Sequence, residues 1–387
     1  MSRPRGTPPY GQPPVVALPL AYLDREQVHP TQPWFCLLRG GVEGAALHKS
    51  IQPNRGFARE TCEQTPITHM KPAYVTISNL IIDDIVLADG RSFMNTLGGA
   101  GTHTLVGMRP WSDALGFVAY RGDDFAAEHR AFLEAMRIDL RGVVLRPGHP
   151  TARAWQLFEH DERRIEIFRT SIDEFYHLRP TFDDIPEDYL QARGFHLQWG
   201  APDDMVGLIT QLRSANPSCK LICEPALAHL AGSLEVNIPV LRSIDLFSPD
   251  RTESEVLTGS RDIATIFATL LGVGTPLVAL RLGAAGSLVG TATGDFYRIP
   301  AVPPAALVDV TGAGNAYCGG FLVGLGRGDQ PAMAAARAAV SASFAIEQIG
   351  VPHFDAAKLA EAERRLEWVL PRIEASGSIE TFLPIQS

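Results

Sequence analysis

Short apolar runs alternate with longer amphipathic segments from about Ala73 onward. A short apolar run between turn residues is typical of a strand buried on both faces, whereas apolar positions three to four residues apart favour a helix. The alternation predicts an α/β fold, in which helices flank a central, mostly parallel sheet. We expect strands at Leu115–Ala119, Gly142–Leu145, Phe195–Gln198, Lys220–Cys223, Ile244–Phe247 and Leu277–Leu280. We expect helices near Asp123–Arg137, Asp203–Arg213, Ile263–Leu271, Gly312–Leu325 and Pro331–Ile346.

The folded body is expected to open with one β-rich run, Tyr74–Ile82, that ends in Asp83-Asp84. Two hairpins interrupt the regular alternation. The first lies near residues 85–94 and turns at Asp89-Gly90, a favourable hairpin dipeptide. The second lies near residues 153–170. Together the hairpins predict a small sheet attached to the main one.

The N-terminal segment has a different composition. Residues 1–33 hold eight of the 29 prolines, which disfavours both helix and sheet. We expect residues 1–72 to be a Pro-rich, partly disordered extension, either dispensable or a docking motif, and residues 73–387 to form the folded domain.

Charge and composition exclude several classes of protein. The 387-residue chain has a formal net charge of −9, so it lacks the overall basic character of nucleic-acid and anionic-membrane binders, although a local anion site stays possible. No apolar run is long enough to span a bilayer, and the prolines after Met1–Arg5 do not resemble a secretory signal. The five scattered cysteines, among them Cys219 and Cys223 in a strand-like run, indicate core residues in a reducing compartment. We therefore expect a cytoplasmic protein.

The segment Leu307–Tyr317 holds the most informative chemistry. It passes from a strand-like end into a helix start built from Gly312, Ala313 and Gly314. Amide groups at a helix N-terminus carry partial positive charge, and residues this small do not block an approaching phosphate. The alternative is tight packing of the helix on a strand, with Thr311 as the N-cap.

Four signals occur in the order found in the PfkB/ribokinase family of small-molecule kinases, and residues 73–370 resemble that family. They are the strand ending at Asp83, the pair Gly98-Gly99 followed by His103, the segment Gly122-Asp123-Asp124-Phe125, and Leu282–Gly286 followed by Asp309–Asn315. The last of these resembles the family's signature loop and is the most specific.

The resemblance implies a ribokinase-like fold in which the two hairpins form a lid over the substrate and serve as a possible homodimer contact. It implies ATP and Mg²⁺ as cofactors and a sugar or sugar-like alcohol as the acceptor. The residues implied to bind the acceptor are Asp83, Gly98, Gly99, His103 and Asp123. Those implied to bind the nucleotide are Thr311, Gly283, Gly286, Asp250 and Glu253, and the amides of Gly312, Ala313 and Gly314 are implied to stabilise the transferred phosphoryl group.

Asn315 is the largest departure from the family pattern, which places an aspartate there as the catalytic base. An amide can hydrogen-bond to a hydroxyl but cannot take its proton near neutral pH. Losing a general base typically lowers a rate by about 10²–10⁴-fold, but positioning and electrostatics also accelerate phosphoryl transfer. We expect slow turnover. The Gly-Ala-Gly-Asn form resembles that of divergent fungal members of the family.

Smaller departures affect the same region. The family's N-x-x-E element is Asp250–Glu253 here, where both carboxylates are candidates for holding Mg²⁺, Asp250 through water. The family's D-P-N is Glu224-Pro225-Ala226, and Arg281 replaces a common threonine. As a surrogate base we rank Asp83 above Asp309.

Three functions are compatible with these motifs. The first is an ATP-dependent kinase of a small alcohol. The second is a pseudokinase that binds ligands on the same fold, as Asn315 and the altered elements would allow. The third is an enzyme repurposed for other chemistry, for which His103 and Asp83-Asp84 provide polar groups.

Overall fold

The computed structural model describes residues 70–160, 164–198, 200–225 and 234–385. The chain divides into two units, Met1–Gln64 and Thr65–Ser387, and the described residues belong to the second. The predicted extension therefore lies almost entirely outside the described residues.

The central sheet has ten strands in the order β14-β13-β12-β11-β10-β9-β8-β1-β4-β5. The strands run parallel from β5 to β11, and β12, β13 and β14 add an antiparallel edge. Their bounds are β1 Tyr74–Ile77, β4 Leu115–Arg121, β5 Ile138–Leu145, β8 Gly194–Gln198, β9 Lys220–Glu224, β10 Leu246–Phe247, β11 Leu277–Arg281, β12 Ser287–Thr291, β13 Phe296–Ile299 and β14 Glu374–Ser376. The predicted mostly parallel sheet is confirmed.

Helices cover both faces of this sheet. Within β9, Ile222 joins one hydrophobic core, whereas Leu221 and Cys223 join the other, because alternate side chains of a strand point to opposite faces. The first core includes residues of α1 Ala100–Met108, α2 Ala127–Ala135, α9 Ala313–Arg327, α10 Pro331–Ala345 and α11 Ala356–Val369. The second includes residues of α4 Pro202–Ala215, α6 Leu234–Ser243, α7 Arg251–Thr258 and α8 Ile263–Gly272. Cys219 and Cys223 are buried and unpaired, as expected.

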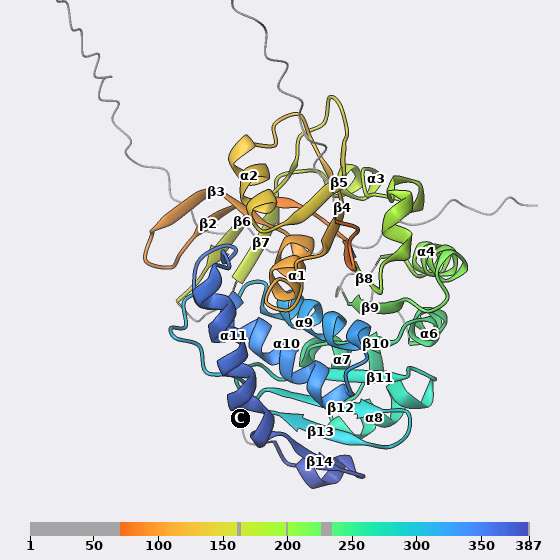
Figure 1. Ribbon diagram of the computed structural model, residues 1–387. Coiled ribbons are helices and arrows are strands. Elements are labelled where there is room, and N and C mark those ends of the chain that lie inside the picture. The colour runs from red at the N-terminus through yellow and green to blue at the C-terminus, as the bar shows by residue number, and fades with distance from the viewer. Residues whose placement is uncertain (1–69, 161–163, 199, 226–233, 386–387) are drawn as a thin grey trace, which may run out of the picture. The chain divides into compact units, whose positions relative to one another are not determined.

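A second, four-stranded sheet lies at the upper left of Figure 1, in the order β3-β2-β6-β7. Its strands are β2 Ile81–Val86, β3 Ser92–Gly98, β6 Ala152–Phe158 and β7 Arg164–Phe168. The pairs β2–β3 and β6–β7 are the two predicted hairpins, and β2 joins β6 in parallel. The short helix α3 Ile172–His177 packs Phe175 in the small core beneath this sheet.

The prediction of one strand over Tyr74–Ile82 is wrong. Strand β1 ends at Ile77, and the chain passes through Ser78-Asn79-Leu80 before β2 begins in the other sheet. The Asn79 side chain accepts a hydrogen bond from Ala100 N at 2.7 Å, which fixes this crossing. Asp83 therefore lies inside a strand of the second sheet and not at the end of a central strand. The sequence predicts one strand here because the residues of the run favour strands throughout, although the polar pair Ser78-Asn79 marks the point where the chain changes sheets.

Other boundaries also differ from the prediction, and β5 begins at Ile138 instead of Gly142. The helix expected near Asp123–Arg137 is α2, which begins at Ala127, because Asp123 and Asp124 hydrogen-bond instead to the backbone of Gly148 and Thr151. The strand expected at Ile244–Phe247 is shorter, Leu246–Phe247.

Helices α1 and α9 approach each other closely at glycines, beside α10 (Figure 1). A Cβ added at Gly107 would lie 2.6 Å from the Ala316 carbonyl carbon, and one added at Gly319 would lie 3.0 Å from Met108 N. A larger residue at either position would force the two backbones apart. This contact sets the relative position of the N-termini of α1 and α9.

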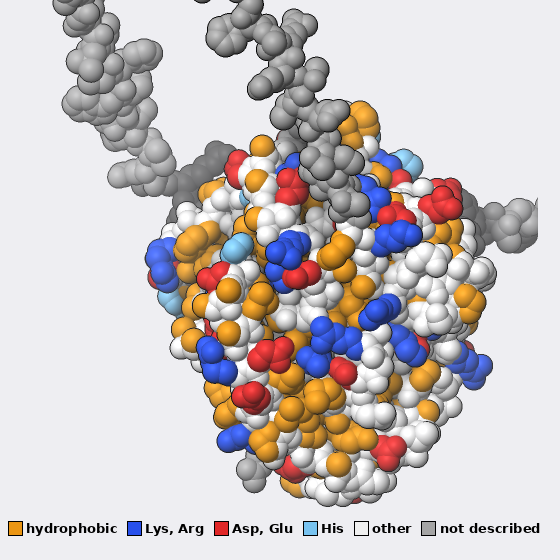
Figure 2. Space-filling model, in the orientation of Figure 1, with side chains coloured by type: hydrophobic (Ala, Val, Ile, Leu, Met, Phe, Trp, Pro, Cys, Tyr) orange, Lys and Arg blue, Asp and Glu red, His pale blue; other side chains and the backbone are white. Residues whose placement is uncertain are grey.

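Surface properties are unexceptional on the face that Figure 2 shows. Among the described residues there, acidic and basic side chains are interspersed over the helices and strands. Within the described ranges, no helix has the length and apolar character needed to cross a membrane.

Replacement of Gly286 by alanine is expected to destabilise the protein more than the same change at Gly294. Both glycines have positive φ, 86° and 89°, and Gly286 has ψ −133°, so each variant carries a backbone cost of roughly 1–3 kcal/mol. Only at Gly286 would the new Cβ also meet backbone, 2.8 Å from Ala301 N, which adds roughly 1–3 kcal/mol of overpacking; at Gly294 the space is open. Urea unfolding of both variants measures the difference, and equal losses would contradict the close packing at Gly286.

Candidate active site

Two helix N-termini meet at the centre of the site. Helix α1 follows Gly99, with φ 88°, and α9 follows Gly312, with φ 77°, a region of backbone conformation that favours glycine. The His103 ring of α1 lies directly against Gly312, since a Cβ added there would lie 2.6 Å from His103 Cε1. The structure thus brings the Gly-Gly motif and the signature loop together.

The start of α9 has the geometry of an anion site. Ala313 N donates to Val310 O at 3.3 Å, and Ala316 N donates to Gly312 O at 2.9 Å. The intervening Gly314 and Asn315 amides belong to the first turn, where N–H groups have no partner within the helix. Gly312, and not Thr311, is the N-cap residue, so the alternative in which Thr311 caps the helix is wrong.

Asp83 is a buried carboxyl group at this site. It is 5% exposed, and Gln156 Nε2 donates to it at 3.1 Å. A Cβ at Gly98 would lie 2.9 Å from Asp83 Cγ, so the carboxyl group fills the space that this glycine leaves. Burial raises the pKa of Asp83 to about 6, with Gln156 opposing the shift and Glu166 and Asp309 adding to it. Asp83 can therefore change its protonation state near neutral pH.

His103 is equally buried, at 4% exposure, and its Nδ1 makes no hydrogen bond with any described residue. Burial lowers the pKa of His103 to about 4, with Asp309 opposing that shift. The imidazole is thus neutral at physiological pH. Asp309 acts electrostatically on both His103 and Asp83, which indicates that the three groups share one neighbourhood.

A buried ionic cluster lies beside the start of α9. Arg281 Nη1 donates to Glu224 Oε1 at 3.1 Å, and its Nη2 donates to Glu253 Oε2 at 3.0 Å. The guanidinium covers Gly314, where an added Cβ would lie 2.9 Å from Arg281 Cζ. The side-chain amide of Asn315 donates to Glu224 Oε2, so one carboxylate holds both Arg281 and Asn315.

The two glutamates of this cluster differ electrostatically. Burial alone would raise the pKa of Glu224, but His196, Arg281 and Asn315 outweigh it and hold that pKa below its usual value. Burial raises the pKa of Glu253 to about 7, and Arg281 only partly offsets this. Glu224 is therefore a fixed anion, whereas Glu253 titrates near neutrality.

Asp250 and Glu253 form a reciprocal capping box at the start of α7. Glu253 N donates to Asp250 Oδ1 at 2.8 Å, and Asp250 N donates to Glu253 Oε2 at 2.7 Å. Each carboxylate keeps one oxygen outside these bonds. Because Arg281 already neutralises charge here, the pair fits contact with a hydrated Mg²⁺ through water better than direct ligation.

The loop after β11 carries the predicted nucleotide-side glycines. Leu282 N donates to Gly286 O at 2.8 Å, and Gly283 has positive φ, 58°, with open space where a side chain would stand. Thr311 lies across from the second sheet, because Arg164 Nη1 donates to its hydroxyl at 3.4 Å. This bond joins β7 to the signature loop. Asp309 accepts from Thr311 N at 2.8 Å and so caps the signature loop.

The other predicted acidic residues have local partners. Asp84 pairs with Arg169 and accepts from Asn95 N at 2.9 Å. Asp123 is exposed and accepts from Gly148 N at 2.7 Å, so its hydrogen bonds connect it to the loop before β6 and not to the residues around α9.

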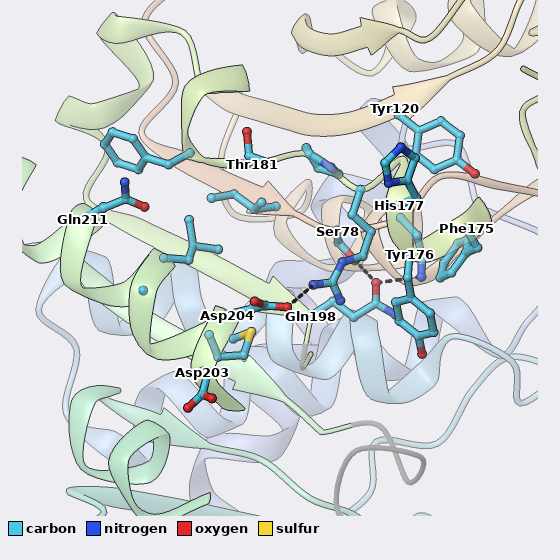
Figure 3. Close-up of a pocket in the computed structure, with 18 residues that line it drawn as sticks. Ser78, Tyr120, Phe175, Tyr176, His177, Thr181, Gln198, Asp203, Asp204 and Gln211 are labelled. Atoms are coloured by element: carbon cyan, nitrogen blue, oxygen red, sulfur yellow. Dashed lines mark hydrogen bonds and ion pairs between the residues drawn. The ribbon is translucent and has the colours of Figure 1, made fainter. Parts of the chain in front are cut away.

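Sequence reasoning missed a pocket of about 480 Å³ at the carboxyl ends of β1 and β8 (Figure 3). Its polar floor holds Ser78, Asn79 and Gln198, in which Asn79 Nδ2 donates to Gln198 Oε1 at 2.7 Å. Aromatic and charged side chains form its walls: Tyr120, Phe175, Tyr176, Phe182, Arg179, Asp203 and Asp204. Asn79 also bonds to Ala100 at the start of α1, so the pocket adjoins the Gly-Gly motif. The polar pair Ser78-Asn79 within an apolar run was the available signal.

Glu224 also lies close to two other side chains that can bind metal ions, those of His196 and Cys318. Ligand atoms of His196, Glu224 and Cys318 lie within 4.8 Å of one another. Both Glu224 oxygens already accept hydrogen bonds, and burial raises the pKa of the Cys318 thiol. These contacts favour a packed, metal-free arrangement.

Comparisons with known proteins agree with this architecture. Residues 75–356 match the model of the pfkB family of carbohydrate kinases. A cytidine kinase of Thermococcus kodakarensis is 28% identical over 262 residues, covering 66% of this chain and 88% of that protein. An uncharacterized protein of Schizosaccharomyces pombe is 27% identical over 321 residues, covering 72% and 85%.

Solved structures show the same fold. The nucleoside kinase of Methanocaldococcus jannaschii, an archaeal member of the ribokinase family, superposes with a TM-score of 0.61 at 19% identity, covering 77% of this chain and 99% of that one. Arabidopsis thaliana ribokinase complexed with ribose and ATP superposes with a TM-score of 0.61 at 22% identity, with the same coverage. The expected ribokinase-like fold is confirmed.

Replacing His103 by asparagine is expected to make stability less sensitive to acid. The folded pKa of about 4 lies below the ordinary value of 6.5, so the unfolded chain binds more protons and the wild type loses stability as pH falls through this interval. Between pH 7 and pH 4 that loss, relative to the variant, should reach roughly 3 kcal/mol. Urea unfolding at several pH values measures it, with exposed His160→Asn as the control. A pH-independent difference between wild type and variant would contradict the burial of a neutral imidazole.

Proposed function

The chain belongs to the pfkB family of carbohydrate kinases, and we propose that it transfers the γ-phosphoryl group of ATP to a hydroxyl of a sugar or sugar-like alcohol. The observation that carries this proposal is the meeting of the two helix N-termini at Gly99 and Gly312, with His103 and Asp83 beside them. The start of α9 can receive the phosphoryl group, and the start of α1 borders the acceptor.

In this arrangement the acceptor hydroxyl lies among Asp83, His103 and Asn315. The amides of Gly314 and Asn315 stabilise charge on the transferred group, because helix N-termini favour anions. The open backbone at Gly283 contacts the nucleotide. Asp250 and Glu253 would hold Mg²⁺ through water, and the ion would supply charge neutralisation to the ATP phosphates.

We infer further that the acceptor is a nucleoside or carries a comparable flat group. The pocket beside the Gly-Gly motif combines aromatic side chains, among them Phe175 and Tyr176, with hydrogen-bonding groups on Ser78, Asn79 and Gln198. Aromatic rings stack on bases, and the polar floor can read their edges. The names of the Thermococcus and Methanocaldococcus proteins, cytidine kinase and nucleoside kinase, support this class.

Asn315 makes slow turnover part of the proposal, since no aspartate stands in the base position. The comparisons lend no support to the pseudokinase alternative. The S. pombe match supports placing the chain among the fungal members that its Gly-Ala-Gly-Asn motif resembles. Free thiols at Cys219, Cys223 and Cys318 support a reducing, cytoplasmic location.

Incubation of the full chain with ATP, Mg²⁺ and a panel of nucleosides and sugars is expected to yield ADP and a phosphorylated nucleoside, identified by mass spectrometry. Chelation of Mg²⁺ should abolish the product, and Asp83→Asn should lower kcat/KM by about 10²-fold through loss of a buried substrate contact. ATP binding without turnover on any acceptor would favour the pseudokinase. A product formed without ATP would favour repurposed chemistry.

We also propose that the chain dimerises through its second sheet. Large apolar side chains on its strands are exposed, including Ile167 at 47% and Met94 at 53%. Covering such side chains is favourable in proportion to the apolar area removed from water. Ile167→Asp is expected to convert a dimer to a monomer in light scattering, whereas Val236→Asp, at an exposed position of α6, should not. A monomeric wild type, or a dimer that resists Ile167→Asp, would contradict the proposal.

A further inference from the structure

Asn315 stands where a kinase of this family would hold its base, and a carboxylate lies directly behind it. The Asn315 amide donates to Glu224 Oε2, although the two residues are 91 positions apart in the chain. Glu224 ends β9 at the carboxyl edge of the central sheet and is almost completely buried. Its other oxygen accepts from Arg281 at 3.1 Å.

We propose that Glu224 is a positioning residue that fixes the Asn315 amide with its oxygen toward the acceptor hydroxyl and, at the same time, holds Arg281 against the phosphate-binding start of α9. This inference rests on the proposed kinase function. It assigns one role to three positions, Glu224, Arg281 and Asn315, at which the sequence departs from its family.

The orientation of Asn315 follows from hydrogen-bond chemistry. An ionised carboxylate can only accept, so the group that Asn315 presents to Glu224 must be its NH₂. The Asn315 Oδ1 is then the end of the amide that can accept a hydroxyl O–H. A flipped amide would place two acceptors against each other, which costs the desolvation of both groups.

The transfer step does not need Asn315 to take a proton. The acceptor oxygen forms a bond to the γ-phosphorus as the bond from that phosphorus to the bridging oxygen breaks, and ADP leaves. The hydroxyl proton passes to an oxygen of the transferred phosphoryl group or to water. Asn315 directs the attacking oxygen, and a loose transition state tolerates late loss of the proton.

The second task of Glu224 concerns Arg281. The guanidinium bridges Glu224 and Glu253 and lies over Gly314, whose missing side chain provides the space. Arg281 therefore adds positive charge next to the α9 amides. Planar two-carboxylate pairing suits arginine and not lysine.

The arrangement explains why restoring the family residue alone should fail. Asn315→Asp would set a carboxylate against Glu224 within hydrogen-bond distance, and two such groups cannot both ionise. One would take up a proton, and the hydrogen bond to Arg281 or to the acceptor would weaken. In the double variant, Asn315→Asp with Glu224→Gln, the glutamine amide at position 224 donates to the aspartate at position 315. The hydrogen bond is therefore restored with its donor and acceptor exchanged.

The test compares four variants of the full chain: Glu224→Gln, Asn315→Asp, the double variant, and Asp245→Asn. The last is the matched control, because Asp245 is also a part-buried carboxylate paired with an arginine, Arg213 at 2.6 Å, but it lies at the amino end of β9. Steady-state kinetics, pH–rate profiles and thermal unfolding are measured for each.

Glu224→Gln should lower kcat by about 10–10²-fold with the KM for ATP changed less than about threefold, while Asp245→Asn keeps kcat within about threefold. Asn315→Asp alone should not exceed the wild-type kcat, and the double variant should exceed both singles. The double variant should also gain a titration in its pH–rate profile, because it adds a carboxylate at position 315 beside residue 224, which Arg281, Glu253, His196 and Cys318 surround.

Thermal unfolding separates this inference from the proposed function. Each single variant should lower Tm, and the double should recover part of the loss, because the two side chains touch. Strict additivity, or a kcat of Glu224→Gln equal to that of Asp245→Asn in an active enzyme, would overturn the inference. The wild type could bind ATP but turn over no acceptor, while the Tm values of the variants are non-additive. That result would overturn the proposed function and the positioning role of Glu224, and would support only the contact between Glu224 and Asn315.

Discussion

The close approach of α1 and α9 is the contact on which the site depends. Glycines at positions 107 and 319 let the two backbones touch, which places the starts of both helices at one end of the pair. Without that contact His103 would not reach Gly312, and the Gly-Gly motif would not adjoin the signature loop. Since packed backbones have little room to shift, the site inherits its geometry from the core and not from its loops.

Local pattern was sufficient to predict much of the fold. The signature loop, the Asp89-Gly90 hairpin and the buried strands each occupy a few consecutive residues, so their propensities are visible in the sequence. The passage from β1 to β2 was not predictable in this way. Residues on both sides of Ser78-Asn79 are apolar and buried, and the crossing is fixed by bonds from Ala100 to Asn79 and from Asn79 to Gln198. Those bonds join segments of the chain that no local pattern connects.

The candidate site shows the same limit more strongly. Gly312, Gly314 and Asn315 share one motif in the sequence, whereas Glu224 and Arg281 are separate departures from the family pattern. They are 57 residues apart in the chain and 3.1 Å apart in space. The surrogate carboxylates ranked from the sequence, Asp83 and Asp309, do not contact Asn315 through any hydrogen bond of the described structure; Glu224 does.

Charge balance gives the departures a common cause. Arg281 is buried between Glu224 and Glu253, and a buried cation is tolerated only when carboxylates surround it. Once Glu224 occupies the space behind α9, an aspartate at position 315 would add a third carboxylate to a cluster with one guanidinium. An amide at 315 satisfies Glu224 without adding charge. In the proposed arrangement Asn315 follows from Glu224, and its neutrality alone does not indicate that catalysis has been lost.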